Sequence, residues 1–280
     1  ISVHLRSERS KLKNLRKSAA GLAYPADYIC EAMDQTRGWF YTLLSVATAL
    51  GYEAPYKNVI SLGLINDKLG QKMSKSKGNI VDPWKIISDY GVDALRWYFY
   101  TATPPGEPKN FDEREIAKAY RKFHLILWNS AMFYRTYGVK IRGSKFETSK
   151  NKTTRTSEAI QLRTSNILDK WILARLNETI SEVDENLNRY HVREAALAIE
   201  ALLDDLSRWY IRRSRRRFSA AFKVMAKNDL KDYESASQTL GFVLAEFTKL
   251  IAPFTPFFAE AMCKKLKTNN SKLITTESIH

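Results

Sequence analysis

A proline-rich break constrains the fold of this chain more than any other feature. Residues 103–108 read Thr-Pro-Pro-Gly-Glu-Pro, with three prolines in six positions. Proline lacks the backbone N–H that helix and sheet interiors need, so neither element can cross this segment. Strand-like and helix-like stretches alternate before it, whereas the sequence after it is helix-like almost throughout. We therefore expect an α/β part over residues 24–110 and an all-α part over residues 111–280.

The α/β part has the pattern of a βαβ unit. A short strand over residues 24–30 is followed by an apolar stretch over 36–50, which we expect to form a buried helix. The β-branched stretch over 59–65 predicts a second, core strand parallel to the first. Asp82 and Pro83 then predict the start of a helix, with Asp as the N-cap and Pro at the first helical position.

The all-α part is predicted from apolar residues at helical spacing. The expected helices cover residues 112–137, 167–188, 192–218, 230–251 and 255–267, and the polar stretch 143–164 reads as a flexible link. Thr255 and Pro256 predict an N-cap and first position for the last helix. We expect the nearby aromatic side chains, Phe254, Phe257 and Phe258, and those of residues 97–100, to pack in the interior.

Charge and cysteine content narrow the function. The 280 residues include 45 Lys+Arg and 30 Asp+Glu, a net charge of +15, and 44% hydrophobic residues are enough to bury a core. A folded, basic chain of this kind most often binds a polyanion, and nucleic acid is the leading candidate. Two cysteines, Cys30 and Cys263, cannot make a four-cysteine zinc site, so we expect no zinc or other protein-bound metal and a reduced, cytoplasmic compartment. The longest apolar stretch, 39–50, is too short to span a membrane.

A loop rich in lysine and serine comes after the second predicted strand, over residues 70–79. The carboxyl edge of a parallel sheet is where ligands of α/β proteins bind. Lysine charges and serine hydroxyls suit the developing charge of a phosphate, although a solvated basic turn has the same composition. The loop is therefore the first candidate for a phosphate site.

Lys72-Met-Ser-Lys-Ser76 matches at all five positions the KMSKS signature of class I aminoacyl-tRNA synthetases. Residues 78–83 and 90–96 resemble the segments on the C-terminal side of that signature in the isoleucyl, valyl and leucyl subgroup. The resemblance implies the second half of a Rossmann-type catalytic domain, which activates an amino acid with ATP and Mg²⁺. It assigns Lys72, Ser74 and Lys75 to catalysis, and Lys72, Met73, Lys75 and Ser76 to ATP binding, with Met73 packing the loop.

A polar string over residues 31–37 precedes the apolar helix of the βαβ unit. Taken alone, it also fits a helix start with Asp34 as the N-cap. Residues 34–40 and 24–27 resemble the isoleucyl family, whereas valyl enzymes have a more apolar string at this place. By the resemblance, Glu31 contacts the aminoacyl-adenylate and Asp34 and Gln35 line its pocket. Ala32 departs from the family, which commonly has Gly there.

Five arginines occupy six positions over residues 212–217. Arginines this dense repel one another unless anions or carboxylates meet them, and phosphate contact with RNA is one solution. Residues 204–215 and 250–260 resemble the helical anticodon-binding domain of the isoleucyl family. We therefore expect binding of tRNA(Ile) by Arg212, Arg213, Arg215, Arg216 and Arg217, although some of these arginines could instead dock the bundle or be solvated.

The HIGH motif of class I synthetases has no counterpart at any of the four histidines. We expect the chain to be a C-terminal portion of an isoleucyl-family enzyme, with the HIGH-bearing N-terminal half as its missing partner and without the editing domain. On its own it should not activate isoleucine. Residues 1–23 are basic and begin with Ile; we expect them to lie outside the resemblance, as after a frameshifted gene start. The alternatives are a valyl enzyme and a tRNA-binding module without catalysis.

Overall fold

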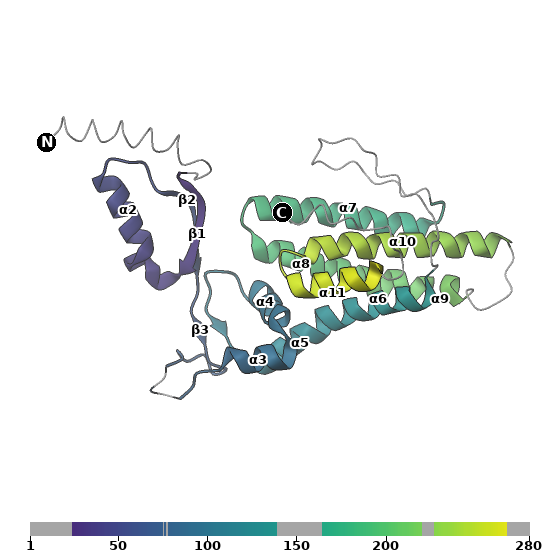
Figure 1. Ribbon diagram of the computed structural model, residues 1–280, viewed down its shortest axis with the longest axis horizontal. Helices are drawn as coiled ribbons and strands as arrows, with labels where there is room; N and C mark the ends of the chain where they lie inside the picture. The colour runs from purple at the N-terminus through teal and green to yellow at the C-terminus, as the bar shows by residue number, and fades with distance from the viewer. Residues whose placement is uncertain (1–23, 75, 77, 139–163, 220–226, 268–280) are drawn as a thin grey trace. The chain divides into compact units, whose positions relative to one another are not determined.

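The computed structural model describes residues 24–74, 76, 78–138, 164–219 and 227–267 (Figure 1). The chain packs into two compact units. Unit 1 comprises Ile1–Lys72 and Pro104–Asn110, and unit 2 comprises Met73–Thr103 and Phe111–His280. The packing therefore differs from the expected division at residue 110, because residues 73–103 pack with the helices that come after the proline-rich break.

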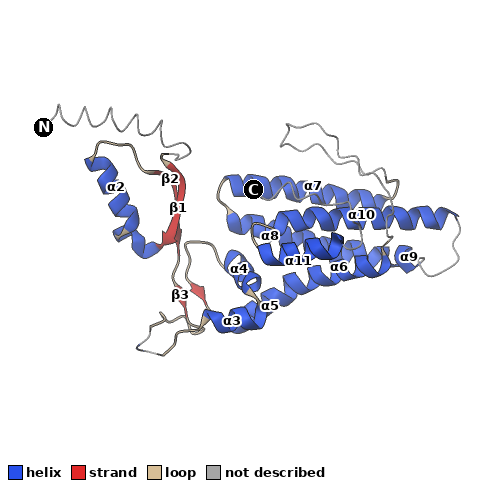
Figure 2. Cartoon of the chain, in the orientation of Figure 1, coloured by secondary structure: helices blue, strands red, loops and turns tan. Residues whose placement is uncertain are grey.

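Unit 1 contains the βαβ unit that the sequence predicts (Figure 2). Strand β1 (Ala26–Ala32) leads through the 3₁₀ helix η1 (Met33–Arg37) and α2 (Trp39–Ala49) to β2 (Tyr56–Leu62). The two strands are parallel, with Ile29 opposite Val59 and Glu31 opposite Ser61. A second parallel pair joins β3 (Ile65–Asn66) to β4 (Lys109–Asn110), which lies directly after the prolines.

The expectation that the helix of this unit is buried is wrong. In α2, Phe40 and Ala47 are buried, but Trp39, Leu44 and Val46 are 44%, 40% and 54% exposed. An apolar helix is buried only where neighbouring elements cover it, and the two-stranded sheet formed by β1 and β2 is too narrow to cover this one on all sides. The apolar composition of α2 thus predicts the helix but not its burial.

Unit 2 is helical, and its elements agree closely with the prediction. Helices α3 (Pro83–Tyr90), α4 (Val92–Thr101) and α7 (Ile167–Asn188) are separate, and α7 has the predicted bounds. The predicted helix 112–137 is divided into α5 (Glu113–Tyr120), the π-helical turn η3 (Arg121–Leu125) and α6 (Ile126–Tyr137). The predicted helix 192–218 is divided in the same way into α8 (Val192–Asp204), the π-helical turn η4 (Asp205–Ile211) and α9 (Arg212–Ser219). Helices α10 (Lys227–Ile251) and α11 (Pro256–Lys267) complete the described part. None of these described helices is long and apolar enough to cross a membrane.

Aromatic packing holds the start of unit 2 against the bundle. Trp97 of α4 is fully buried and stacks on Phe123, with ring centroids 3.6 Å apart, as expected for residues 97–100. Phe254 is also buried and meets Trp97 edge-to-face. Phe258 packs partly buried against the same core, but Phe257 is 69% exposed, so the expectation of a buried side chain is wrong for Phe257.

The start of α11 is capped from a distant helix. Asp93 of α4 accepts a hydrogen bond from the N–H of Phe258 at 2.5 Å, whereas the Thr255 hydroxyl donates backwards to the carbonyl of Ile251. Thr255 directly precedes the helix, as the sequence predicts, and its carbonyl accepts the first helical hydrogen bond from Ala259, but its hydroxyl does not cap the helix. A buried carboxylate supplies the acceptor instead and ties α4 to α11, and burial raises the pKa of Asp93.

Candidate functional site

A tight turn positions the first residue of the KMSKS loop within unit 1. The Asp67 carboxylate accepts hydrogen bonds from the N–H groups of Leu69 and Gln71, at 2.9 and 2.8 Å. Lys72 then makes an antiparallel bridge with Asn66, and its side chain is exposed. Residues 66–70 thus form a polar turn that Asp67 organises. Sequence reasoning missed this role, although an Asp three residues before Gly70 is a turn signal.

The rest of the described loop lies in unit 2 and is held by a side-chain amide. Asn79 accepts the N–H of Ser74 at 2.9 Å, and the hydroxyl oxygens of Ser74 and Ser76 are 3.2 Å apart. Met73 is half-buried and packs against the cluster around Ile86, in agreement with a packing role. Lys75, which the resemblance assigns to the ATP phosphates, lies outside the described residues. Asn79 is a second positioning residue that the sequence did not single out.

The carboxyl end of β1 carries the candidate amino-acid residues. Glu31 is exposed there, in register with Ser61 at the end of β2. Burial, aided by the negative charge of Glu31, raises the pKa of the neighbouring Cys30 thiol. Because ligands bind beyond the carboxyl ends of parallel strands, Glu31 is well placed for a substrate contact. Asp34 comes next in η1 and is also exposed.

Gln35, and not Asp34, caps helix α2. Its side-chain oxygen accepts the N–H of Trp39 at 2.9 Å, and its amide donates to Asp34 at 3.3 Å. A Cβ at Gly38 would come within 2.6 Å of that oxygen, so the absence of a side chain at Gly38 makes room for the cap. The alternative interpretation with Asp34 as N-cap is thus corrected, and Gln35 orients Asp34 as well as the helix.

Four of the five arginines of α9 are exposed. Arg212, Arg213, Arg215 and Arg216 all present exposed side chains, and the buried Ser214 interrupts the run. Guanidinium groups displayed along one helix suit the phosphates of a nucleic acid backbone.

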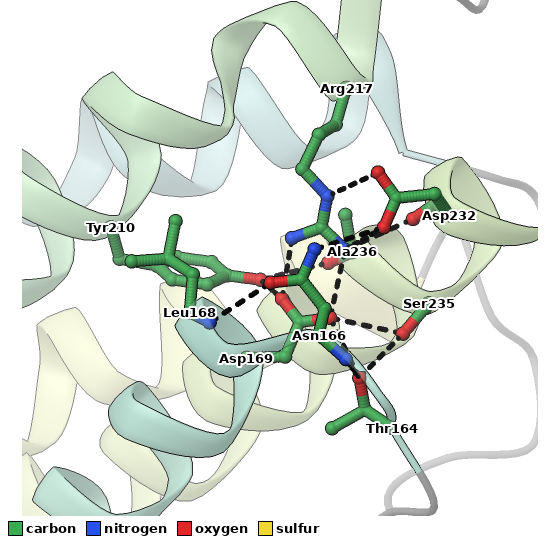
Figure 3. A network of polar contacts seen from close by, with 9 residues as sticks. All are labelled: Thr164, Asn166, Leu168, Asp169, Tyr210, Arg217, Asp232, Ser235 and Ala236. Carbon is green, nitrogen blue, oxygen red and sulfur yellow. Dashed lines mark hydrogen bonds and ion pairs between the residues drawn. The ribbon is translucent and has the colours of Figure 1, made fainter. Parts of the chain in front are cut away.

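Arg217 lies differently, inside a network of carboxylates (Figure 3). Its side chain is 11% exposed and makes two hydrogen bonds to Asp169, at 2.6 and 2.9 Å. The same guanidinium bonds to Asp232 at 2.8 and 2.9 Å. Carboxylates thus occupy the donors that a phosphate would need. The structure therefore argues against the expected tRNA contact of Arg217 and gives this residue a structural role.

The network centres on Asp169, which is fully buried. Its carboxylate also accepts hydrogen bonds from Tyr210 at 2.8 Å and Ser235 at 3.0 Å. Burial alone would raise the pKa of Asp169, but the hydrogen bonds from Arg217 and Tyr210 outweigh it and lower the pKa below its usual value. In the described part of the chain, no group of three His, Cys, Asp or Glu side chains could hold a metal ion.

Two family descriptions match the chain. Residues 7–112 match the class I tRNA synthetases for Ile, Leu, Met and Val, and residues 169–280 match the anticodon-binding domain of tRNA ligases. The chain therefore carries part of a class I tRNA synthetase domain, followed by an anticodon-binding domain of tRNA ligases. Since the first match begins at residue 7, residues 7–23 lie inside the family resemblance, contrary to our expectation.

Within that class, its relatives are isoleucine–tRNA ligases. The enzyme of Dehalococcoides mccartyi CBDB1 is 44% identical over 90% of this chain and 23% of its own length. The enzyme of Clostridium novyi is 42% identical over 92% of this chain and 23% of its own length, and that of Deinococcus radiodurans is 42% identical over 89% and 22%. The chain thus spans less than a quarter of these relatives.

Solved synthetases share the fold. The methionyl-tRNA synthetase of Mycobacterium tuberculosis, in complex with methionyl-adenylate, matches with a TM-score of 0.68 and 20% identity over 85% of this chain and 44% of its own. A leucyl-tRNA synthetase of Agrobacterium radiobacter K84, in a ternary complex with tRNA, matches with a TM-score of 0.58 and 21% identity over 86% of this chain and 27% of its own.

Proposed function

We propose that this chain supplies the KMSKS loop and the anticodon-binding domain of an isoleucine–tRNA ligase. The observation that carries the proposal is the 44% identity to such a ligase over 90% of the chain. The substrates would be isoleucine, ATP with Mg²⁺, and tRNA(Ile). The unit formed by β1, α2 and β2 would be the second half of a Rossmann-type domain, and the likeness to two solved synthetases supports this assignment. A reaction on tRNA of the translation machinery suggests a cytoplasmic location.

In the activation step, the isoleucine carboxylate would attack the α-phosphorus of ATP, and pyrophosphate would leave. Catalysis of this step is mostly positioning and charge stabilisation. Lys72 and Lys75 would neutralise phosphate charge, while the Ser74 and Ser76 hydroxyls donate hydrogen bonds. Met73 anchors the loop by packing against the cluster around Ile86. Mg²⁺ would arrive with the ATP phosphates, since this ion keeps several waters and needs few protein ligands.

On the amino-acid side, Glu31 and Asp34 would contact the aminoacyl-adenylate from the end of β1 and from η1. Gln35 would position Asp34, because its side-chain amide donates a hydrogen bond to Asp34 and its side-chain oxygen accepts the N–H of Trp39 in the first turn of α2. In the helical unit, the exposed arginines of α9 would bind tRNA phosphates, and Arg217 would hold the bundle together.

The test uses a chimera, because the chain covers only 23% of its relatives. This chain replaces the matching segment of the Clostridium novyi enzyme, and amino-acid-dependent ATP–pyrophosphate exchange is measured. We expect exchange with isoleucine, and a loss of about 100-fold or more in Lys75→Ala, the scale of losing one charge-stabilising contact. Lys118→Ala, which removes an exposed lysine paired with Glu115, is the matched control and should exchange normally.

Exchange with valine instead of isoleucine would favour the valyl alternative. A folded chimera that binds tRNA but shows no exchange would overturn the proposal and favour a tRNA-binding module.

A further inference from the structure

Two polar side chains of α4 hold the turn between α10 and α11. The Arg96 guanidinium donates to the carbonyl of Phe254 at 2.9 Å and to the carbonyl of Pro253 at 3.1 Å. Asp93, one helical turn earlier in α4, accepts the N–H of Phe258 at 2.5 Å. Side chains three residues apart share a helix face, so Asp93 and Arg96 reach both sides of the same turn. We call these two residues the α4 clamp.

The α4 clamp fixes a direction more than it adds stability. Asp93 is 6% exposed, and burial raises the pKa of its carboxyl group because the interior disfavours the charged form. A serine or an asparagine would cap a helix without that cost. Hydrogen bonds require alignment of donor and acceptor, so the three bonds of the clamp set the angle of α4 and its position along the turn.

The other face of α4 supports the KMSKS loop. Leu95 and Tyr98 are buried in the cluster around Ile86, and Met73 packs against this cluster. Helical spacing places Leu95 and Tyr98 on the side of α4 that faces away from the clamp. Helix α4 therefore joins the α10–α11 turn to Met73 through contacts that all lie within unit 2.

The KMSKS loop depends on this support because it is divided between the two units. Lys72 belongs to unit 1, whereas the loop from Met73 onward belongs to unit 2. Within unit 2, the Asn79 side chain accepts the N–H of Ser74 at 2.9 Å, so this part of the loop is attached to the body that α4 helps to orient. Groups that position a substrate must keep their geometry closely, since a displacement of about 1 Å can lower a rate about 100-fold.

We propose that Asp93 and Arg96 are positioning residues for amino-acid activation. By fixing α4 on the α10–α11 turn, they hold Met73 and Ser74 in the place from which the KMSKS loop meets the phosphates of ATP. Neither clamp residue would contact the substrate itself. The inference rests on the proposed function, from which it takes the ATP role of the loop, and it adds the α10–α11 turn as a determinant of ATP binding.

The test uses the chimera with the Clostridium novyi enzyme and measures ATP–pyrophosphate exchange at varied ATP and at varied isoleucine. Arg96→Ala removes both bonds to the turn and should raise the KM for ATP roughly 10-fold, the equivalent of one weakened phosphate contact. The KM for isoleucine should stay unchanged, because Glu31 and Asp34 belong to unit 1. Arg96→Lys keeps the charge but cannot bond both carbonyls as a fork, so its KM for ATP should lie between the two.

A double-mutant cycle tests the route through Met73. If Arg96 acts on ATP through Met73, Arg96→Ala should add little to the effect of Met73→Ala in the double variant. Tyr233→Phe is the matched control, since it removes another side-chain hydrogen bond to a backbone carbonyl of unit 2, that from Tyr233 to Tyr137 at 2.8 Å. This control should keep both KM values. Circular dichroism shows whether each variant is folded, and if Arg96→Ala does not fold, the KM of Arg96→Lys for ATP decides.

Kinetic constants separate positioning from mere stability. A smaller folded fraction lowers the exchange rate but leaves the KM values unchanged, so a normal KM for ATP in the Arg96 variants would overturn the inference and leave the clamp a structural role. Full additivity of Arg96→Ala and Met73→Ala would also overturn it. Both outcomes leave the proposed function standing, because the unmodified chimera still exchanges with isoleucine. An unmodified chimera without any exchange would refute the proposed function, and this inference with it.

Discussion

Replacing Arg217 with Ala should destabilise the helical unit much more than replacing any of the neighbouring arginines of α9 with Ala. The guanidinium of Arg217 is the cation that faces the buried Asp169, to which it donates two hydrogen bonds. Removing it leaves the carboxylate with the neutral donors Tyr210, Ser235 and Thr164. A buried charge that has lost its partner is costly, because the interior solvates it far less well than water does.

The structure sets the size of the effect. Removing one partner of a buried ion pair costs about 3–5 kcal/mol, and Asp169 is 0% exposed. The contacts to Asp232 add less, since its side chain is 43% exposed and solvent screens it. We therefore expect Arg217→Ala to lower the free energy of unfolding by about 3–5 kcal/mol at neutral pH.

Urea unfolding followed by far-UV circular dichroism measures this loss. Arg215→Ala is the matched control, since it removes an exposed arginine from the same helix and should change stability by no more than about 0.5 kcal/mol. Adding Asp169→Asn to Arg217→Ala should recover part of the loss, because the buried charge is gone. The stability difference between Arg217→Ala and the unmodified chain should also become smaller at acid pH. Without Arg217, the pKa of Asp169 in the folded state rises above its value in the unfolded state. The variant therefore gains stability as the pH falls and Asp169 takes up a proton. Equal stability of Arg217→Ala and Arg215→Ala would refute the reasoning.

Three further changes test other parts of the structure. Burial lowers the pKa of His124 from 6.5 to about 4, so the unfolded state binds the proton more tightly and the protein loses stability as the pH falls. His124→Phe should therefore reduce by about 2 kcal/mol the decrease in unfolding free energy between pH 7 and pH 5, as measured by urea unfolding at both pH values. Asp93→Ala removes the cap of α11 at Phe258 and should cost about 1–2 kcal/mol in the same assay, and an unchanged midpoint would show that the cap is dispensable. Gln35→Ala removes the side chain that accepts the Trp39 N–H and should raise the hydrogen-exchange rate of that amide about 5-fold, the effect of about 1 kcal/mol; unchanged exchange would assign the cap elsewhere.

The helices were predictable because their signals are local. The apolar spacing of residues 167–188 and the Asp82-Pro83 start depend on neighbours a few positions apart, and both are confirmed, with Asp82 accepting the N–H of Trp84 at 2.9 Å. Burial of α2 was not predictable, because it depends on how much sheet lies beside the helix. The cap of α11 comes from Asp93, far away in the sequence, so no local pattern shows it.

The candidate site was also predictable only where its signals are local in the sequence. The KMSKS signature predicts a phosphate loop directly, but the residues that hold this loop, Asp67 and Asn79, become visible only from the hydrogen bonds that they accept. The arginine run predicts an anion-binding helix, yet it cannot separate Arg217 from its neighbours, because Asp169 lies 48 residues away and meets it only in the folded bundle. Likewise, residue preference favours Asp34 as the cap of α2, yet in the fold the Gln35 side chain accepts the N–H of Trp39.

Charging of tRNA tests the central claim most directly. The chimera with the Clostridium novyi enzyme is incubated with ATP, Mg²⁺ and purified tRNA(Ile), and attachment of radiolabelled isoleucine is compared with that of radiolabelled valine. We predict stable isoleucyl-tRNA(Ile), with a rate that falls when Arg212, Arg213, Arg215 and Arg216 are changed together to Ala and that is retained in the Lys118→Ala control. Charging with valine alone, or tRNA binding without any charging by a folded chimera, would contradict the assignment of this chain to an isoleucine–tRNA ligase.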